Sequence, residues 1–200
     1  MPPRAAKSIL KKYWNGTIPV DADMLKGFAA KLHVGILAHI RSGAFCGEYL
    51  PFGLQPGSPP LIVYNLRQPV ARQSFVLAHC LGHHLLKHGR CPQETAYSAH
   101  TSDPREKGAN AFAVELLLPE EAVREYIHHL RTQGGMSIEV FSRHFHVEPA
   151  LMSLRLHDLG IEAGHPAFPG PTRIPLQAHE KSKLHASNFY RGKVYTPNIR

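Results

Sequence analysis

The stretch Ser74–His84, S-F-V-L-A-H-C-L-G-H-H, places two histidines in a run of helix-forming residues. His79 and His83 are four positions apart, and on a helix this spacing sets both imidazoles on one face, about one turn apart. Two imidazoles arranged in this way can hold one divalent metal ion, for which zinc is the usual occupant. The stretch therefore predicts a metal-binding helix, which we expect over residues 69–87 with Gly89 ending it.

The residue after the first histidine decides how much chemistry this helix can perform. In the motif H-E-x-x-H the glutamate is the general base of a zinc peptidase, and here that position is Cys80. General acid–base catalysis by such a glutamate increases the reaction rate by roughly 10²–10⁴-fold. Polarisation of water and of the substrate carbonyl by the metal does not require the glutamate. We therefore expect a site that binds metal but hydrolyses peptides slowly or not at all.

Two states of Cys80 are compatible with the sequence. A thiol has an ordinary pKa of about 8.5, and beside a dication it could ionise and become an extra ligand in the position that water needs. We favour the other interpretation, an inert buried or half-buried thiol. A native and an introduced Cys80 would look the same in the sequence.

A catalytic zinc site usually has three protein ligands, so two histidines leave it one short. The candidates that follow the helix are His88, His100, Asp103 and Glu106. His88 is nine residues after His79, and on a continuous helix it would face away. Asp103 and Glu106 also match the N-cap and N3 pattern of a capped helix, which explains Glu106 without any metal. Spacing alone leaves both interpretations of Glu106 open.

The rest of the chain predicts short helices around a small sheet. We expect helices at 8–14 (ended by Asn15-Gly16), after the N-cap Asp21, from Asp103-Pro104, from Pro119 to Gly134-Gly135, and as a pair within 137–160; we expect strands at 34–40, 44–50 and 60–65. Residues 90–102 are polar and irregular. The tail from residue 161 to 200 has six Lys or Arg and two Glu, and we expect it to be an extended basic extension.

Composition sets the class of protein. The chain has 200 residues, 43% of them apolar, which is enough for one core with an appendage. Three cysteines are too few for a disulfide framework, so we interpret them as reduced thiols in a cytosol. No signal peptide is visible, and no stretch approaches the roughly 20 apolar residues of a membrane span. We therefore expect a cytoplasmic protein that does not enter a membrane.

Two sequence blocks carry a family resemblance. The run R-Q-S-F-V-L-A-H-C-L-G-H-H-L-L-K-H at 72–88 resembles F-T-L-A-H-E-L-G-H-x-L-L-H, the signature of the ImmA/IrrE metallopeptidases. The run E-K-G-A-N-A-F-A-V-E-L-L-L-P at 106–119 is similar to their second block, E-x-x-A-N-x-F-A-x-x-L-L-M-P. Two blocks in the right order and spacing are specific, and the resemblance extends over residues 8–161.

This resemblance implies an α+β, zincin-like core of helices packed on a small mixed sheet over 1–135 and a helix-turn-helix-like segment over 136–161, whereas the tail over 162–200 has no counterpart in it. It implies that His79, His83 and Glu106 ligate Zn²⁺, with Mn²⁺ as a second candidate, and that Cys80 occupies the place of the catalytic glutamate. Family members cut helix-turn-helix repressors and so derepress stress or mobile-element genes. The expected partner is therefore such a repressor. The alternative is a metal-binding pseudo-peptidase that acts as a protein-interaction or regulatory module.

Other polar residues have weaker functional interpretations. Net charge is +8, but in the segment at 137–160 the stretch Ala150–Gly160 offers little besides Arg155 and His157 for reading bases, so we do not expect direct nucleic-acid binding. His84 and His88 form a second i, i+4 pair, which we interpret as exposed rather than as a metal site. We expect Arg72, just ahead of the central motif, to meet solvent.

Overall fold

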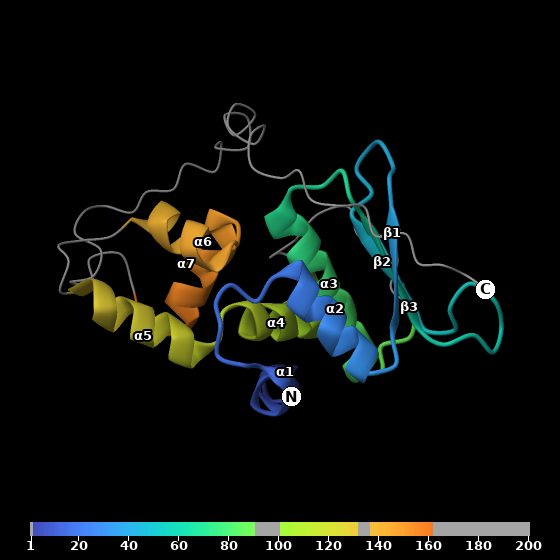
Figure 1. Cartoon of the computed structure of the whole chain (residues 1–200), viewed down its shortest axis with the longest axis horizontal. Helices are drawn as coiled ribbons and strands as arrows, with labels where there is room; N and C mark the ends of the chain where they lie inside the picture. Colours follow the sequence, from blue (N-terminus) through green and yellow to red (C-terminus); the bar gives the residue numbers. More distant parts are fainter. Residues whose placement is uncertain (1, 91–100, 132–136, 162–200) are drawn as a thin grey trace.

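The structure, a computed structural model, describes residues 2–90, 101–131 and 137–161 and has an α+β fold (Figure 1). The described elements are α1 (Pro2–Tyr13), α2 (Ala22–Lys31), β1 (Gly35–His39), β2 (Gly47–Leu50), β3 (Leu61–Asn65), α3 (Val70–Leu85), α4 (Pro104–Leu117), α5 (Glu120–Arg131), α6 (Ile138–Phe145) and α7 (Pro149–Asp158). The predictions for His100, for the Gly134-Gly135 helix end and for the tail at 162–200 lie outside the described residues. None of the described helices has the length and apolar character needed to span a membrane.

The three strands form the small mixed sheet that the resemblance implies. The strand order is β1-β3-β2, with β1 parallel and β2 antiparallel to the central strand β3. Helices α2 and α3 lie along one face of this sheet (Figure 1). On β2, a Cβ atom at Gly47 would overlap both the Val76 side chain of α3 and the Val63 carbonyl of β3. Only glycine allows β2, β3 and α3 to approach so closely there.

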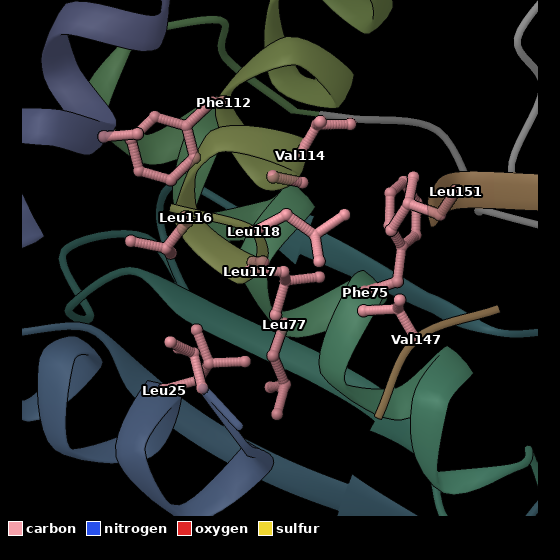
Figure 2. Close-up of a cluster of buried hydrophobic side chains, with 14 of the residues drawn as sticks. Leu25, Phe75, Leu77, Phe112, Val114, Leu116, Leu117, Leu118, Val147 and Leu151 are labelled. Atoms are coloured by element: carbon pink, nitrogen blue, oxygen red, sulfur yellow. The ribbon is translucent and has the colours of Figure 1, made fainter. Parts of the chain in front are cut away.

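The other helices gather on the side of α3 away from the sheet, and one apolar core joins them to it. Figure 2 shows Phe75 of α3 beside Val147, in the turn between α6 and α7, and beside Leu151, in the first turn of α7. All three side chains are buried, at 7% exposed or less. Apolar packing therefore attaches α6 and α7 to the core of the protein.

Two ion pairs also link α7 to the core. Arg72 of α3 makes a bidentate pair with Glu148 at the start of α7, with distances of 2.7–2.9 Å. Arg155 of α7 donates to Glu115 of α4 at 2.9 Å and to the Leu118 carbonyl at 2.9 Å, and both side chains of the pair are buried. The expectation that Arg72 meets solvent was wrong, because a carboxylate 76 positions along the chain covers it.

The first helix is longer than the sequence pattern indicates. We expected a short helix at 8–14, whereas α1 runs over Pro2–Tyr13 and buries Ala6, Ile9 and Leu10. Pro2 and Pro3 occupy its first turn, where the missing N–H of proline costs no helical hydrogen bond. The apolar face of α1 packs against α4, the helix that carries Glu106.

Candidate metal centre

Helices α3 and α4 carry the three predicted metal ligands and cross at close range. A Cβ atom built at Gly82 of α3 would lie 3.1 Å from the Ala109 Cα and 3.1 Å from Phe112. The absence of a side chain at Gly82 thus lets the α4 backbone approach the helix turn that carries His79 and His83. Glu106 lies in the first turn of α4 and is brought to the same point.

The structure brings His79, His83 and Glu106 together. One donor atom from each lies within 4.8 Å of the other two. The two Nε2 atoms are 2.9 Å apart, and the Glu106 oxygens lie 3.2 Å from His79 Nε2 and 3.5 Å from His83 Nε2. A capping box would pair Glu106 with the Asp103 N–H, but that N–H donates to Thr101 Oγ1 at 3.3 Å, while Asp103 caps α4 by accepting from Arg105 N.

These separations fit a tetrahedral metal site. Zinc binds imidazole nitrogen and carboxylate oxygen at about 2.0–2.2 Å, so tetrahedral angles place neighbouring donors about 3.3–3.6 Å apart. The observed 2.9, 3.2 and 3.5 Å need adjustments of only a few tenths of an ångström. Two imidazoles and one carboxylate are also a donor set that zinc accepts in peptidases. The cluster can therefore bind a metal ion, and its geometry alone does not identify that ion.

The electrostatics keep His83 ready to act as a ligand. Burial, with the neighbouring His79 as the next cause, lowers the pKa of His83 from 6.5 to about 3, against the opposing effect of Glu106. The imidazole is therefore neutral at physiological pH and offers a lone pair without first releasing a proton. Glu106, with 16% of its side chain exposed, is the ligand candidate closest to solvent.

Cys80 lies beside this cluster but outside it. Its thiol is completely buried, and among the described residues it is not part of the group of donors that could hold a metal. It lies near Tyr49 of β2, whose phenol pKa is raised by burial and, second, by Cys80. The Tyr49 hydroxyl in turn lies 2.9 Å from His84 Nδ1. The position that would carry the catalytic base therefore holds a buried thiol next to an aromatic hydroxyl.

Two histidine predictions were wrong. His84 is half-buried and bonded to Tyr49, so His84 and His88 do not form an exposed pair. His88 does not face away from the cluster, because its Nδ1 lies 3.3 Å from Nδ1 of His83. The continuous-helix argument failed since α3 ends at Leu85 and the chain turns back. Helical periodicity does not predict the direction of a side chain that lies beyond the end of the helix.

Comparison with known families explains this arrangement. A family model described as the IrrE N-terminal-like domain matches residues 39–157, which is more than half of the chain. The chain belongs to the IrrE N-terminal-like family. The metallopeptidase resemblance seen in the two sequence blocks is thereby confirmed. The matched region includes α3, α4 and all three residues of the cluster that could hold a metal ion in this IrrE-like domain.

One similar solved structure is a Mycobacterium tuberculosis transcriptional regulator, with a TM-score of 0.53 at 15% sequence identity. The match covers 77% of this chain but only 46% of the regulator, so the IrrE-like chain spans less than half of that protein's length. At this identity the likeness supports the shared α+β fold alone. No curated protein matches the chain.

Proposed function

We propose that this IrrE-like chain is a zinc-binding metallopeptidase scaffold with impaired peptide hydrolysis. Its metal ligands are His79, His83 and Glu106, and Cys80 takes the place of the general base. The observation that carries the proposal is the convergence of three suitable donor atoms from α3 and α4 within 4.8 Å. Mn²⁺ is the second candidate ion, because a carboxylate ligand such as Glu106 also suits it.

Each residue of the proposed site has a separate role. His83 presents a neutral nitrogen, His79 presents its Nε2 atom beside it, and Glu106 compensates one charge of a dication. When bound, zinc supplies Lewis-acid polarisation of a peptide carbonyl. A thiol at Cys80 is two atoms shorter than the family glutamate and is buried, so it is poorly placed to carry a proton to the leaving amine. Loss of that proton transfer accounts for roughly 10²–10⁴-fold in rate.

The proposed partner is a helix-turn-helix repressor in the cytoplasm, as the family implies. In this proposal residues 1–135 form the peptidase domain, 136–161 a helix-turn-helix-like segment and 162–200 a basic tail. Direct DNA reading by the segment is disfavoured, because Arg155, one of its two base-reading candidates, is buried in the pair with Glu115. Recognition helices need such side chains exposed toward the groove.

A second candidate function is a pseudo-peptidase that binds metal and a protein partner without cutting it. The complete burial of Cys80 favours this candidate. Two other carboxylates that could replace the missing base are paired with arginines. Glu115 of α4 pairs with Arg155, and Glu48 of β2 lies 3.7 Å from Arg90. The two candidates share the metal site and differ only in hydrolysis.

Metal content tests the shared part. The purified protein should contain about one zinc per chain after zinc loading and desalting, and Glu106→Ala should lose it. Glu120→Ala is the matched control, because it removes an exposed carboxylate that pairs with Arg124 outside the cluster. Zinc at full stoichiometry in Glu106→Ala would remove the proposed site.

Cleavage separates the two candidates. The unaltered protein and a Cys80→Glu variant are incubated with a helix-turn-helix repressor, with and without chelator. Chelator-sensitive cleavage that is slow in the unaltered protein and faster in Cys80→Glu supports the impaired peptidase, whereas no cleavage by the unaltered protein supports the pseudo-peptidase. Chelator-sensitive cleavage by the unaltered protein would show that the base is dispensable and would exclude the pseudo-peptidase.

A further inference from the structure

Four described helices end in the same chain reversal. After α2, α3, α6 and α7 one residue adopts a left-handed backbone, and the N–H of the next residue donates to a carbonyl five positions earlier. For α3 the left-handed residue is Lys87, with φ of 57°, and His88 N donates to the His83 carbonyl at 3.0 Å. Such an ending presses the side chain that follows the turn against the last turn of its own helix.

At the other three helices this contact is apolar. The residues that follow the turn are Val34 after α2, Val147 after α6 and Ile161 after α7, and all of them are buried. Helix ends with a left-handed residue are commonly stabilised by an apolar contact of this kind. At α3 the equivalent residue is an imidazole, His88, and the residue that it meets is His83.

The contact at α3 is directed and polar. His88 Nδ1 lies 3.3 Å from His83 Nδ1, and the two rings meet edge to face with centroids 5.1 Å apart. His83 directs its other nitrogen, Nε2, at His79 and Glu106. Gly108 of α4 leaves room for the His88 ring, because a Cβ atom there would lie 3.2 Å from His88 Cε1.

We propose that His88 is a positioning residue that fixes the tautomer and orientation of His83, an inference that rests on the proposed metal site. For His83 Nε2 to offer a lone pair, its proton must be on Nδ1. His83 Nδ1–H then donates to His88 Nδ1, and His88 carries its own proton on Nε2. A partner of this kind on the second nitrogen of a ligand histidine typically changes metal affinity by about 10–100-fold.

Two variants separate the hydrogen bond from the packing. His88→Phe keeps an aromatic ring against His83 and Gly108 but removes the acceptor. His88→Asn places an amide oxygen where Nδ1 lies and should restore the interaction. Lys87→Gly is the matched control, because glycine accepts the left-handed backbone and leaves His88 in place. Circular dichroism and thermal melting confirm that each variant folds.

The first measurement uses the metal-free protein, so that it does not depend on the metal site. Nitrogen-15 NMR of the imidazoles should show His83 protonated on Nδ1 in the unaltered protein, in Lys87→Gly and in His88→Asn. His88→Phe should shift the proton toward Nε2. A His83 spectrum that His88→Phe leaves unchanged would overturn the proposal, whatever the protein does with zinc.

The second measurement is zinc affinity by competition with a chromogenic chelator. His88→Phe should bind zinc about 10–100-fold more weakly than the unaltered protein, with His88→Asn in between and Lys87→Gly unchanged. Equal affinity in His88→Phe and in the unaltered protein would refute the positioning role. Absence of zinc binding in the unaltered protein would instead refute the proposed function, and the NMR result would still decide whether His88 sets the state of His83.

Discussion

The buried pair between Glu115 and Arg155 gives the sharpest stability prediction, because it joins α4, the helix of Glu106, to α7. The Glu115→Ala variant leaves the guanidinium of Arg155 with the Leu118 carbonyl but without its carboxylate. Only 8% of the Arg155 side chain and 5% of the Glu115 side chain are exposed, so the pair is largely shielded from water.

The expected cost follows from this burial. Removing one partner of a buried ion pair destabilises a protein by about 3–5 kcal/mol, chiefly because a charge is left buried and uncompensated. The remaining bond to Leu118 offsets part of this cost, so we expect about 3 kcal/mol. The contact of Lys7 with Glu115, 3.9 Å long and with Lys7 half exposed, adds less than about 1 kcal/mol.

The assay is urea unfolding followed by circular dichroism, with thermal melting beside it. For a chain of this size about 3 kcal/mol corresponds to a decrease in melting temperature of roughly 6–12 °C. The control Glu120→Ala breaks only partly exposed pairs with Arg124 and Lys7 and should cost less than about 1 kcal/mol. A Glu115→Ala variant within 1 kcal/mol of the unaltered protein, on the order of that control, would refute the reasoning from burial.

Three further predictions concern the site and its supports. Cys80→Glu should raise chelator-sensitive peptide hydrolysis by roughly 10²–10⁴-fold, and an unchanged rate would mean that another group limits catalysis. The metal-free protein should lose roughly 2–3 kcal/mol of stability as the pH falls from about 6.5 to 4.5. In this range His83 takes up a proton in the unfolded chain but stays neutral in the folded protein, where its pKa is about 3. A free energy of unfolding, measured by urea titration, that does not change with pH would contradict this. Gly47→Ala should destabilise by at least about 2 kcal/mol through its clash with Val76, whereas Gly27→Ala, with open space around it, should be neutral or stabilising in the same unfolding assay.

The grouping of His79, His83 and Glu106 could be predicted from the sequence. His79 and His83 share a helix face, and the resemblance of the second block selected Glu106, which spacing alone had left open. The strands were also predictable, since L-I-V-Y-N-L contains β3 in an apolar, β-branched run. These features depend on residues close together in the chain.

The supports of the site could not be predicted for the opposite reason. Lys87 is not a glycine, so nothing in the sequence announced the left-handed residue that turns His88 back onto His83. The pairing of Arg72 with Glu148 joins positions 76 residues apart, and only the packing of α7 on α3 brings them together. Helix phase and composition carry no information on such contacts.

The most direct test of the metal site is an anomalous-diffraction map from crystals of the zinc-loaded protein. The account predicts one strong peak at about 2.0–2.2 Å from Nε2 of His79, Nε2 of His83 and a carboxylate oxygen of Glu106, with Cys80 outside the coordination sphere. A zinc ion bound away from these three residues, or coordinated by the Cys80 thiolate, would contradict it.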